Sequence, residues 1–323
     1  MLKAVILFAI GLVLLIKGGD WFVDGATGIA RRFRLPDIIV GATVVSIGTT
    51  LPEVMVSATG ALGGQGAMAY GNAIGSIICN TTLISAISVA VNPGPVNTKT
   101  MKMPVIFFFA SAAIYCVAAY LLGEFPRWLG IVMLAIFVTY MLITVRQGLK
   151  NPDAAHEEEE GGESKPKSLW LELLLLVGGA AIIAVGADLL VDNGTFIAQE
   201  LGVPETVIAL TFVALGTSLP ELVTTITSLR KGHASLGIGN VIGANIFNLV
   251  LVSGVSVTLA PFEVPVGNTL FGMNSSLVLD MPLMIAVMAL LTIPALLRKK
   301  LSRWQGIALL AIYAAFCVVQ FAL

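Results

Sequence analysis

The sequence predicts an all-α polytopic membrane protein, with ten transmembrane helices in two inverted-topology five-helix repeats. The first observation is composition: 57% of the 323 residues are hydrophobic and 11% are charged, whereas soluble domains carry about 25% charged residues. The second is that the two halves of the chain repeat one another. A transmembrane β-barrel is excluded, because barrel strands alternate about every ten residues and the apolar runs here are continuous.

Ten apolar runs are long enough to span a bilayer as helices. The first resembles a secretory signal, but no small-residue cleavage site follows it cleanly, so we expect a retained spanning helix. The three cysteines lie in predicted spans and indicate neither a disulfide framework nor a zinc site. The predicted spans are residues 3–30, 37–62, 68–92, 102–122, 126–147, 169–196, 203–229, 235–260, 279–298 and 303–322.

A polar segment at 149–168 separates a first repeat, 1–148, from a second, 169–323. It is acidic and lacks aromatic residues, so we expect a solvated linker. Basic residues gather in alternate loops, and the positive-inside rule then places both termini outside and the linker in the cytoplasm. On that topology the cytoplasmic side holds Arg31, Arg32, Arg34, Lys99, Lys102, Arg146, Lys150, Lys165, Lys167, Arg230, Lys231, Arg298, Lys299, Lys300 and Arg303.

The repeat is exact in register over a long stretch. Adding 168 to the residue number maps Glu53 onto Glu221, "GNAIG" onto "GNVIG" and Asn80 onto Asn248 without a gap. Further on, "RWLGI" from Arg127 matches "RWQGI" from Arg303. Each half holds an odd number of spans, so the second half enters the membrane the other way up. This plan is typical of secondary transporters, whose substrate site lies near the midplane.

Glu53 and Glu221 lie within predicted spans. A carboxylate at the bilayer centre costs roughly 2.5–3.5 kcal/mol on insertion scales, so it needs a partner. No buried basic residue is available to both glutamates: Lys17 has no basic twin, and Asp20, three residues away, is its nearer partner. We therefore infer that the partner is a cation and that the cation is the substrate.

The neighbouring residues favour the same interpretation. Each glutamate follows a proline, which lacks an N–H and is expected to break the helix at the glycine four residues earlier. The break would free backbone carbonyls beside hydroxyl side chains, and asparagines of the next helix would return to a similar depth. An all-oxygen shell suits hard cations such as Ca²⁺ and Na⁺. The residues are Gly48, Thr49, Thr50, Pro52, Ser76 and Asn80, with Gly216, Thr217, Ser218, Pro220 and Asn248.

Other roles stay open at this point. A single intramembrane glutamate can be a structural hydrogen-bonding residue, and asparagines can join helices. A second set of twinned acids has no hydroxyl or helix-break companions, so we interpret it as structural or cavity-lining. That set is Asp20, Asp24, Asp188 and Asp192.

The paired motifs resemble a known family. "GTTLPEV" with "GNAIGSIICN", and "GTSLPEL" with "GNVIGANIFN", resemble the two alpha-repeats of the calcium/cation antiporter superfamily, here within 41–84 and 209–252. The most similar branch is the prokaryotic sodium/calcium exchangers. The resemblance implies cation sites between helices 2, 3, 7 and 8. It also implies electrogenic exchange of Na⁺ for Ca²⁺ by alternating access, with helices 1 and 6 sliding over the core.

Carried onto this sequence, the resemblance makes Glu53 and Glu221 the Ca²⁺ carboxylates. It assigns the Na⁺ ligands to the backbone carbonyls of Ser46 and Ala214 and to the side chains of Thr49, Thr50, Ser76, Asn80, Thr217, Ser218 and Asn248. Two positions depart from the family. Ala244 replaces a frequent serine, and Asn248 replaces a frequent aspartate, which argues against potassium co-transport.

The sequence therefore predicts a sodium/calcium antiporter that exports Ca²⁺, not an enzyme, with no cofactor. The expected partners are Ca²⁺, Na⁺ and the lipid bilayer of a prokaryotic cytoplasmic (inner) membrane, with no nucleic acid and a functional monomer. The alternative is exchange of H⁺ for Ca²⁺ or another divalent cation, since the same glutamates could cycle protons. An intramembrane hydrolase with paired carboxylates and a passive cation channel are the other readings considered.

Overall fold

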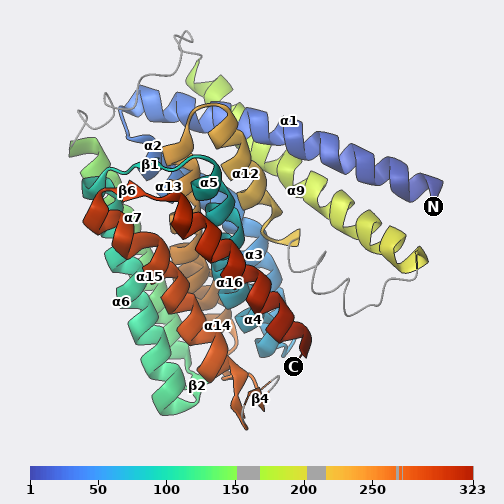
Figure 1. The fold of residues 1–323 in the computed structure, drawn as a ribbon, viewed down its shortest axis with the longest axis vertical. Coiled ribbons are helices and arrows are strands. Elements are labelled where there is room, and N and C mark those ends of the chain that lie inside the picture. The colour runs from blue at the N-terminus through green and yellow to red at the C-terminus, as the bar shows by residue number, and fades with distance from the viewer. Residues whose placement is uncertain (151–167, 202–215, 267–268, 271, 323) are drawn as a thin grey trace.

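The computed structural model describes residues 1–150, 168–201, 216–266, 269–270 and 272–322. Within these ranges, nine helices are long and apolar enough to cross a membrane, and they match nine of the ten predicted spans. The remaining span, 203–229, begins in the undescribed segment 202–215, and its described part is α12, Leu219–Arg230. The all-α membrane architecture is confirmed (Figure 1). Most of the predicted linker lies outside the described residues, so its boundary stays a prediction.

The first half begins with one unbroken helix, and its second and third spans each contain a turn of π-helix. The elements are α1 (Leu2–Phe33), α2 (Asp37–Val40), η1 (Gly41–Val45), α3 (Ser46–Leu62), α4 (Gly66–Cys79), η2 (Asn80–Ile84), α5 (Ser85–Val91), α6 (Thr98–Leu122) and α7 (Arg127–Lys150).

The second half follows the same plan where it is described. Its elements are α9 (Leu169–Glu200), α12 (Leu219–Arg230), α13 (Ala234–Phe247), η4 (Asn248–Val252), α14 (Ser253–Leu259), η5 (Ser276–Asp280), α15 (Met281–Arg298) and α16 (Arg303–Ala322). Both η2 and η4 begin at the twinned asparagines, Asn80 and Asn248. Since π-turns widen a helix locally and are frequent at functional sites, this repetition draws attention to the two asparagines.

In the part of the chain that the structure describes, three short antiparallel ladders join loops, and they were not predicted. They pair β1 (Gly94–Pro95) with β6 (Lys300–Leu301), β2 (Glu124–Phe125) with β3 (Phe262–Glu263), and β4 (Thr269–Leu270) with β5 (Met273–Asn274). Two-residue strands are too short to show an alternating pattern, so the sequence carries no signal for them. The ladders β1–β6 and β2–β3 occupy equivalent places in the two halves and fix loops at opposite turns of the repeat.

Helices α1 and α9 pack against each other along their length and lie across the remaining bundle (Figure 1). Small residues allow the two backbones to approach closely. A Cβ placed on Gly25 would lie 2.4 Å from the backbone nitrogen of Leu176, and one on Gly179 would lie 2.5 Å from that of Phe22. The pair is further joined by Arg32 of α1, whose Nε donates to Glu172 of α9 at 2.9 Å.

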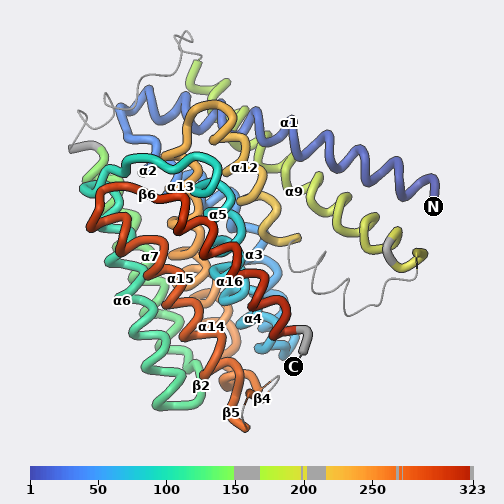
Figure 2. Tube along the Cα trace, viewed as in Figure 1, coloured from blue at the N-terminus to red at the C-terminus, as the bar shows by residue number. Residues whose placement is uncertain are grey.

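The centre of the bundle is formed by the third and eighth spans. The segment 234–259 is the most enclosed of the membrane-length helices, with 83% of its most apolar window buried, against 28% for α1. Helix α13 contacts α2, η1, α3, α6 and α12, which belong to both halves (Figure 2). The polar residues of these central spans are therefore enclosed by protein rather than lipid.

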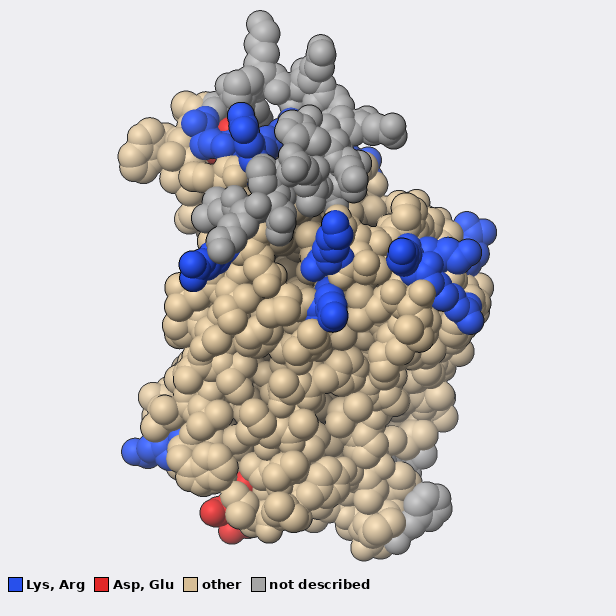
Figure 3. Space-filling model, turned by 90° about the vertical axis from the view of Figure 1, so that its left-hand side faces the viewer, with Lys and Arg blue, Asp and Glu red and all other residues tan. Residues whose placement is uncertain are grey.

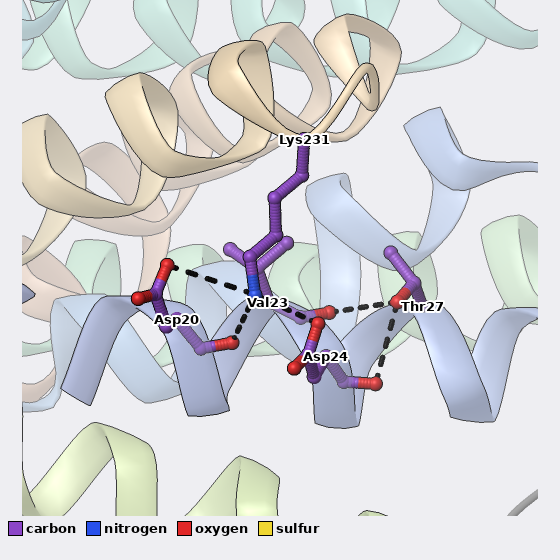
Figure 4. Close-up of polar contacts among 5 residues, drawn as sticks. All are labelled: Asp20, Val23, Asp24, Thr27 and Lys231. Carbon is purple, nitrogen blue, oxygen red and sulfur yellow. Dashed lines mark hydrogen bonds and ion pairs between the residues drawn. The ribbon is translucent and has the colours of Figure 1, made fainter. Parts of the chain in front are cut away.

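One predicted pairing is wrong. Asp20 was expected to pair with Lys17, but Lys17 is exposed and Asp20 instead faces Lys231, the residue that follows α12. The Lys231 ammonium lies 2.7 Å from Asp24 Oδ1, 3.7 Å from Asp20 Oδ1 and 2.7 Å from the Asp20 carbonyl oxygen (Figure 4). Proximity in sequence is a poor guide here, because the turn after α12 reaches this face of α1 only in the folded protein.

Candidate cation site

Glu53 and Glu221 are both fully buried. Neither oxygen of Glu53, and only Oε1 of Glu221, has a hydrogen-bond partner among the described residues. The two carboxylates are close enough to interact electrostatically with one another, like charge with like charge. Buried charges are tolerated when they are paired or coordinate a metal, so this arrangement calls for a cation between or beside the two groups.

The two glutamates are presented by differently shaped segments. Glu53 lies in α3, which continues without interruption through Pro52, so the predicted helix break at Gly48 is wrong. At Gly48 the helix packs closely on α1, since a Cβ there would lie 3.1 Å from the Phe22 ring. In the second half, a turn at 217–218 interrupts the helical conformation. Helix α12 then begins at Leu219, with Pro220 in its first turn. There the predicted break is confirmed.

The segments that carry the twinned asparagines pack crosswise against the helices that carry the glutamates. Asn80 begins η2, which packs against α12, the helix of Glu221, and Asn248 begins η4, which packs against α3, the helix of Glu53. Both asparagines are fully buried, and no side-chain atom of either has a hydrogen-bond partner in the described part of the chain. Among the described residues, every side-chain polar atom of Glu53, Asn80 and Asn248, and Oε2 of Glu221, is therefore buried without a hydrogen-bond partner.

Hydroxyl groups close the gap between the halves. Thr50 Oγ1 lies 3.5 Å from Glu221 Oε1, while Thr49 Oγ1 lies 3.2 Å from Asn240 Oδ1. Ser76 is buried on α4, one turn before Asn80, and the buried Ser218 Oγ has no partner among described residues. Of the other predicted ligands, Thr217 borders a crevice beside α9, and Ala214 lies outside the described residues.

Ser46 has side-chain contacts in addition to the carbonyl predicted as a ligand. It was predicted to contribute its carbonyl, which receives Thr49 Oγ1 at 3.5 Å, the limit of a hydrogen bond. Its hydroxyl donates to the Gly41 carbonyl at 2.7 Å and lies 3.0 Å from the Asn240 carbonyl. The Ser46 side chain therefore connects α3 to α13, in addition to the proposed role of its carbonyl as a ligand.

Asn240 and its twin Asn72 contact the candidate site residues, and neither was among the predicted ligands. Asn240 Oδ1 accepts from Thr49 Oγ1 at 3.2 Å and lies 3.3 Å from Ser46 Oγ, both in the other half, and its Nδ2 has no partner among the described residues. Asn72 Nδ2 instead donates to the Glu53 carbonyl at 3.2 Å and to Ser57 Oγ at 2.8 Å. The signal was present, because both residues are the asparagine of the repeated Gly-Asn motif.

A crevice of about 850 Å³ lies beside the segments that precede the two glutamates, since Pro52 and Pro220 line it. It lies between α1, α3 and α9 and is lined mainly by aliphatic side chains, but Asp188, Asp192 and Thr217 border it. In the first half the equivalent acids, Asp20 and Asp24, are paired with Lys231. The cavity-lining role considered for the twinned aspartates therefore applies to the second pair, and an ion-paired role to the first.

The donor set suits a hard cation. The described residues contain no cluster of three or more His, Cys, Asp or Glu side chains. The region offers two carboxylates, amide oxygens and hydroxyls instead, which are ligands preferred by Ca²⁺ and Na⁺ rather than by soft metals. Two formal negative charges match one divalent cation.

Comparison with known proteins decides the family. A family model described as "Sodium/calcium exchanger protein" matches residues 3–146 and 171–322. The chain belongs to the sodium/calcium exchanger family. This membership makes it a transporter rather than an enzyme, which removes the hydrolase reading. The fold and the repeated motifs therefore belong to an integral membrane protein that moves ions.

Relatives cover the chain nearly end to end. It is 31% identical to "Sodium/calcium exchanger MaX1" of Methanosarcina acetivorans over 98% of both chains. It is 34% identical to "Putative antiporter CaxA" of Alkalimonas amylolytica over 99% of both. A solved structure of the sodium-calcium exchanger NCX_Mj, soaked with Na⁺ and Sr²⁺, is 32% identical and superimposes with a TM-score of 0.80 over 97% of each chain.

Proposed function

We propose that the protein exchanges Na⁺ for Ca²⁺ across the membrane by alternating access, exporting Ca²⁺, at a site built on Glu53 and Glu221. The observation that carries the proposal is the pair of fully buried carboxylates. Three of their four oxygens have no hydrogen-bond partner in the described chain, and the fourth, Glu221 Oε1, lies 3.5 Å from Thr50 Oγ1. A permanently unpaired buried charge costs several kcal/mol. A transported cation removes that cost each time it binds.

Both ions would use the same carboxylates. One Ca²⁺ neutralises Glu53 and Glu221 together, and Na⁺ would neutralise them separately with help from neutral oxygens. Binding of the two ions is then mutually exclusive, which couples their opposite movements. The neutral ligands we propose are the side chains of Thr49, Thr50, Ser76, Asn80, Thr217, Ser218 and Asn248 and the carbonyls of Ser46 and Ala214.

We further propose that the protein resides in a prokaryotic cytoplasmic membrane as a functional monomer, with both termini outside and the 149–168 linker in the cytoplasm. Basic side chains gather toward one end of the molecule (Figure 3), as the positive-inside rule expects for the cytoplasmic end. Accessibility of single cysteines at either terminus, measured in intact cells with an impermeant reagent, tests this orientation.

The deciding experiment is ⁴⁵Ca²⁺ uptake into proteoliposomes that are loaded with Na⁺ and diluted into choline at equal pH. We expect uptake to require the Na⁺ gradient and to be lost in Glu53→Gln and Glu221→Gln. The matched control is Glu124→Gln, which removes an exposed carboxylate at the β2–β3 ladder. Wild-type uptake in either buried variant would overturn the site.

H⁺/Ca²⁺ exchange is the second candidate, because the two buried carboxylates could carry protons instead of Na⁺. The same vesicles separate the two functions. Uptake that ignores Na⁺ and follows an imposed pH gradient would assign the protein to proton coupling. A saturating flux that needs a counter-ion would exclude a passive channel in either case.

A further inference from the structure

A basic hollow lies at one end of the bundle, away from the cation site. Its volume is about 530 Å³, and its walls are the turn between α15 and α16 and the loop before α6. Four of the residues that line the hollow are cationic, and no lining residue is acidic. The complete lining is Pro93, Gly94, Pro95, Arg298, Lys299, Lys300, Leu301, Ser302 and Arg303.

The backbone of this hollow is fixed on both sides. Lys299 adopts a left-handed conformation, φ 56°, which turns the chain sharply at the end of α15. Gly94 and Pro95 then pair with Leu301 and Lys300, and Val96 N donates to the Lys299 carbonyl at 3.0 Å. The neighbouring lysines are thus carried by a braced turn rather than by a free loop.

The cations have little to neutralise them. Arg298, Lys299, Lys300 and Arg303 are exposed, and no salt bridge joins any of them to an acid in the described part of the chain. Arg303 Nε donates to the Ala90 carbonyl at 2.9 Å, which orients its guanidinium. Like charges held this close repel one another, and an anion between them would relieve that repulsion.

The fold itself does not require positive charge here. The equivalent ladder of the other half, β2–β3, pairs Glu124 with Glu263 and Phe125 with Phe262. Arg127 is the twin of Arg303, and its Nη2 likewise bonds a backbone carbonyl, that of Leu259, at 3.3 Å. The same two-stranded ladder therefore carries acidic residues at one end of the molecule and basic residues at the other. The fold does not explain the basic residues, so we look for their cause in what surrounds the hollow.

The surroundings indicate a lipid. Exposed apolar side chains flank the hollow: Leu297 is 79% exposed, Val91 63%, and Ile307, one turn after Arg303, 57%. Trp304, next to Arg303, is 45% exposed, and tryptophan favours the headgroup level of a bilayer. Basic side chains above an apolar, aromatic rim suit a phosphate headgroup with its acyl chains against the helices.

We propose that the hollow between the β1–β6 ladder and the start of α16 binds the phosphate headgroup of an anionic phospholipid. The lipid would rest on Lys299, Lys300, Arg298 and Arg303 and brace the ends of α15 and α16. This inference is independent of the ion-exchange site, because no residue of the hollow belongs to that site.

The test is native mass spectrometry of the full-length protein in detergent, titrated with phosphatidylglycerol or phosphatidylcholine. We expect phosphatidylglycerol to bind in preference. The double variant Lys299→Gln/Lys300→Gln should weaken that binding on the order of thirtyfold, at about 1 kcal/mol for each basic residue near the surface. The control is Arg34→Gln/Arg230→Gln, which removes two basic residues outside the hollow and should bind like the wild type.

Equal weakening in both double variants would overturn the site, since it would reflect overall charge. No weakening in Lys299→Gln/Lys300→Gln would also overturn it. A third arm adds glycerol-1-phosphate or inorganic phosphate as competitor: displacement of phosphatidylglycerol at equal concentration would assign the hollow to a soluble anion instead of a lipid. Size-exclusion chromatography confirms that each variant is folded, and Lys299→Arg/Lys300→Arg should keep the binding.

Discussion

The two repeats share a motif but not a conformation. In the first, α3 runs unbroken through Pro52, and the acids of α1, Asp20 and Asp24, are held by Lys231. In the second, a turn at 217–218 precedes Pro220, and the equivalent acids of α9, Asp188 and Asp192, border a crevice. If the halves were alike in structure, the site would be equally open or closed toward both sides. Under the proposed exchange by alternating access, this difference would open the site toward one side of the membrane at a time.

One residue that differs between the repeats contributes to this asymmetry. Lys231 follows α12, whereas the equivalent position of the first repeat is Gly63, which carries no charge. The lysine can therefore hold α1, but no counterpart can hold α9 in the same way. Since α1 and α9 are packed backbone to backbone, an ion pair to one of them restrains both.

The largest expected effect addresses what the repeats share. Glu53→Gln and Glu221→Gln should each reduce the apparent Ca²⁺ affinity by at least about a hundredfold, since unbalancing a buried charge costs about 3 kcal/mol or more. The two losses should be similar despite the different helix shapes. Na⁺-driven ⁴⁵Ca²⁺ uptake over a range of Ca²⁺ concentrations measures both. A loss confined to one glutamate would mean that the repeats are functionally unequal.

The next effect concerns the joint between the repeats. Gly25→Ala places a Cβ 2.4 Å from Leu176 N and 2.6 Å from the Glu172 carbonyl, so α1 and α9 must separate. We expect the free energy of unfolding to fall by about 2 kcal/mol. This net loss remains after alanine has gained roughly 1 kcal/mol in helix propensity over glycine. Thermal unfolding of the detergent-purified protein measures it. Gly178→Ala, with no neighbouring atom within 4 Å in the described chain, is the control and should not be destabilised.

A smaller effect separates the twinned asparagines. Asn240 bonds Thr49 and Ser46 of the other half, whereas Asn72 bonds Glu53 and Ser57 of its own. Asn240→Ala should therefore lower the apparent affinity for Na⁺ in exchange about tenfold. This is in the range seen when residues that orient ligands are removed. Asn72→Ala should act mainly on Ca²⁺ through Glu53. Identical Na⁺ and Ca²⁺ profiles in the two variants would contradict this distinction.

The smallest effect tests the restraint by Lys231. Its partners are partly exposed, so the ion pair contributes only about 0.5–1 kcal/mol. Lys231→Gln should then lower the population of the present conformation by a few fold. The readout is the labelling rate of Ala184→Cys, which lines the crevice, by an impermeant maleimide in a variant without the native cysteines. The adjacent substitution Arg230→Gln should leave the rate unchanged. Equal labelling rates in the Lys231→Gln and Arg230→Gln variants would mean that Lys231 does not stabilise the present conformation.

The sequence by itself determined the helices, the two carboxylates and their twinned asparagines. Spanning length and hydrophobicity are local properties, and an unpartnered glutamate in an apolar run stands out without knowledge of its neighbours. The register of 168 residues placed the second motif as soon as the first was recognised. For the same reason the described spans agree with the prediction to within a few residues at most ends.

Only the tertiary structure decided which partners meet. Pro52 was expected to break its helix, but the packing of Phe22 on Gly48 accompanies an unbroken α3, while the same motif at Pro220 follows a turn. Lys231 reaches Asp24 and Asn240 reaches Thr49 from more than 190 residues away in the chain. Local patterns specify how one segment folds, but the energy of a buried polar contact depends on a second segment, whose position is set by the packing of the whole bundle.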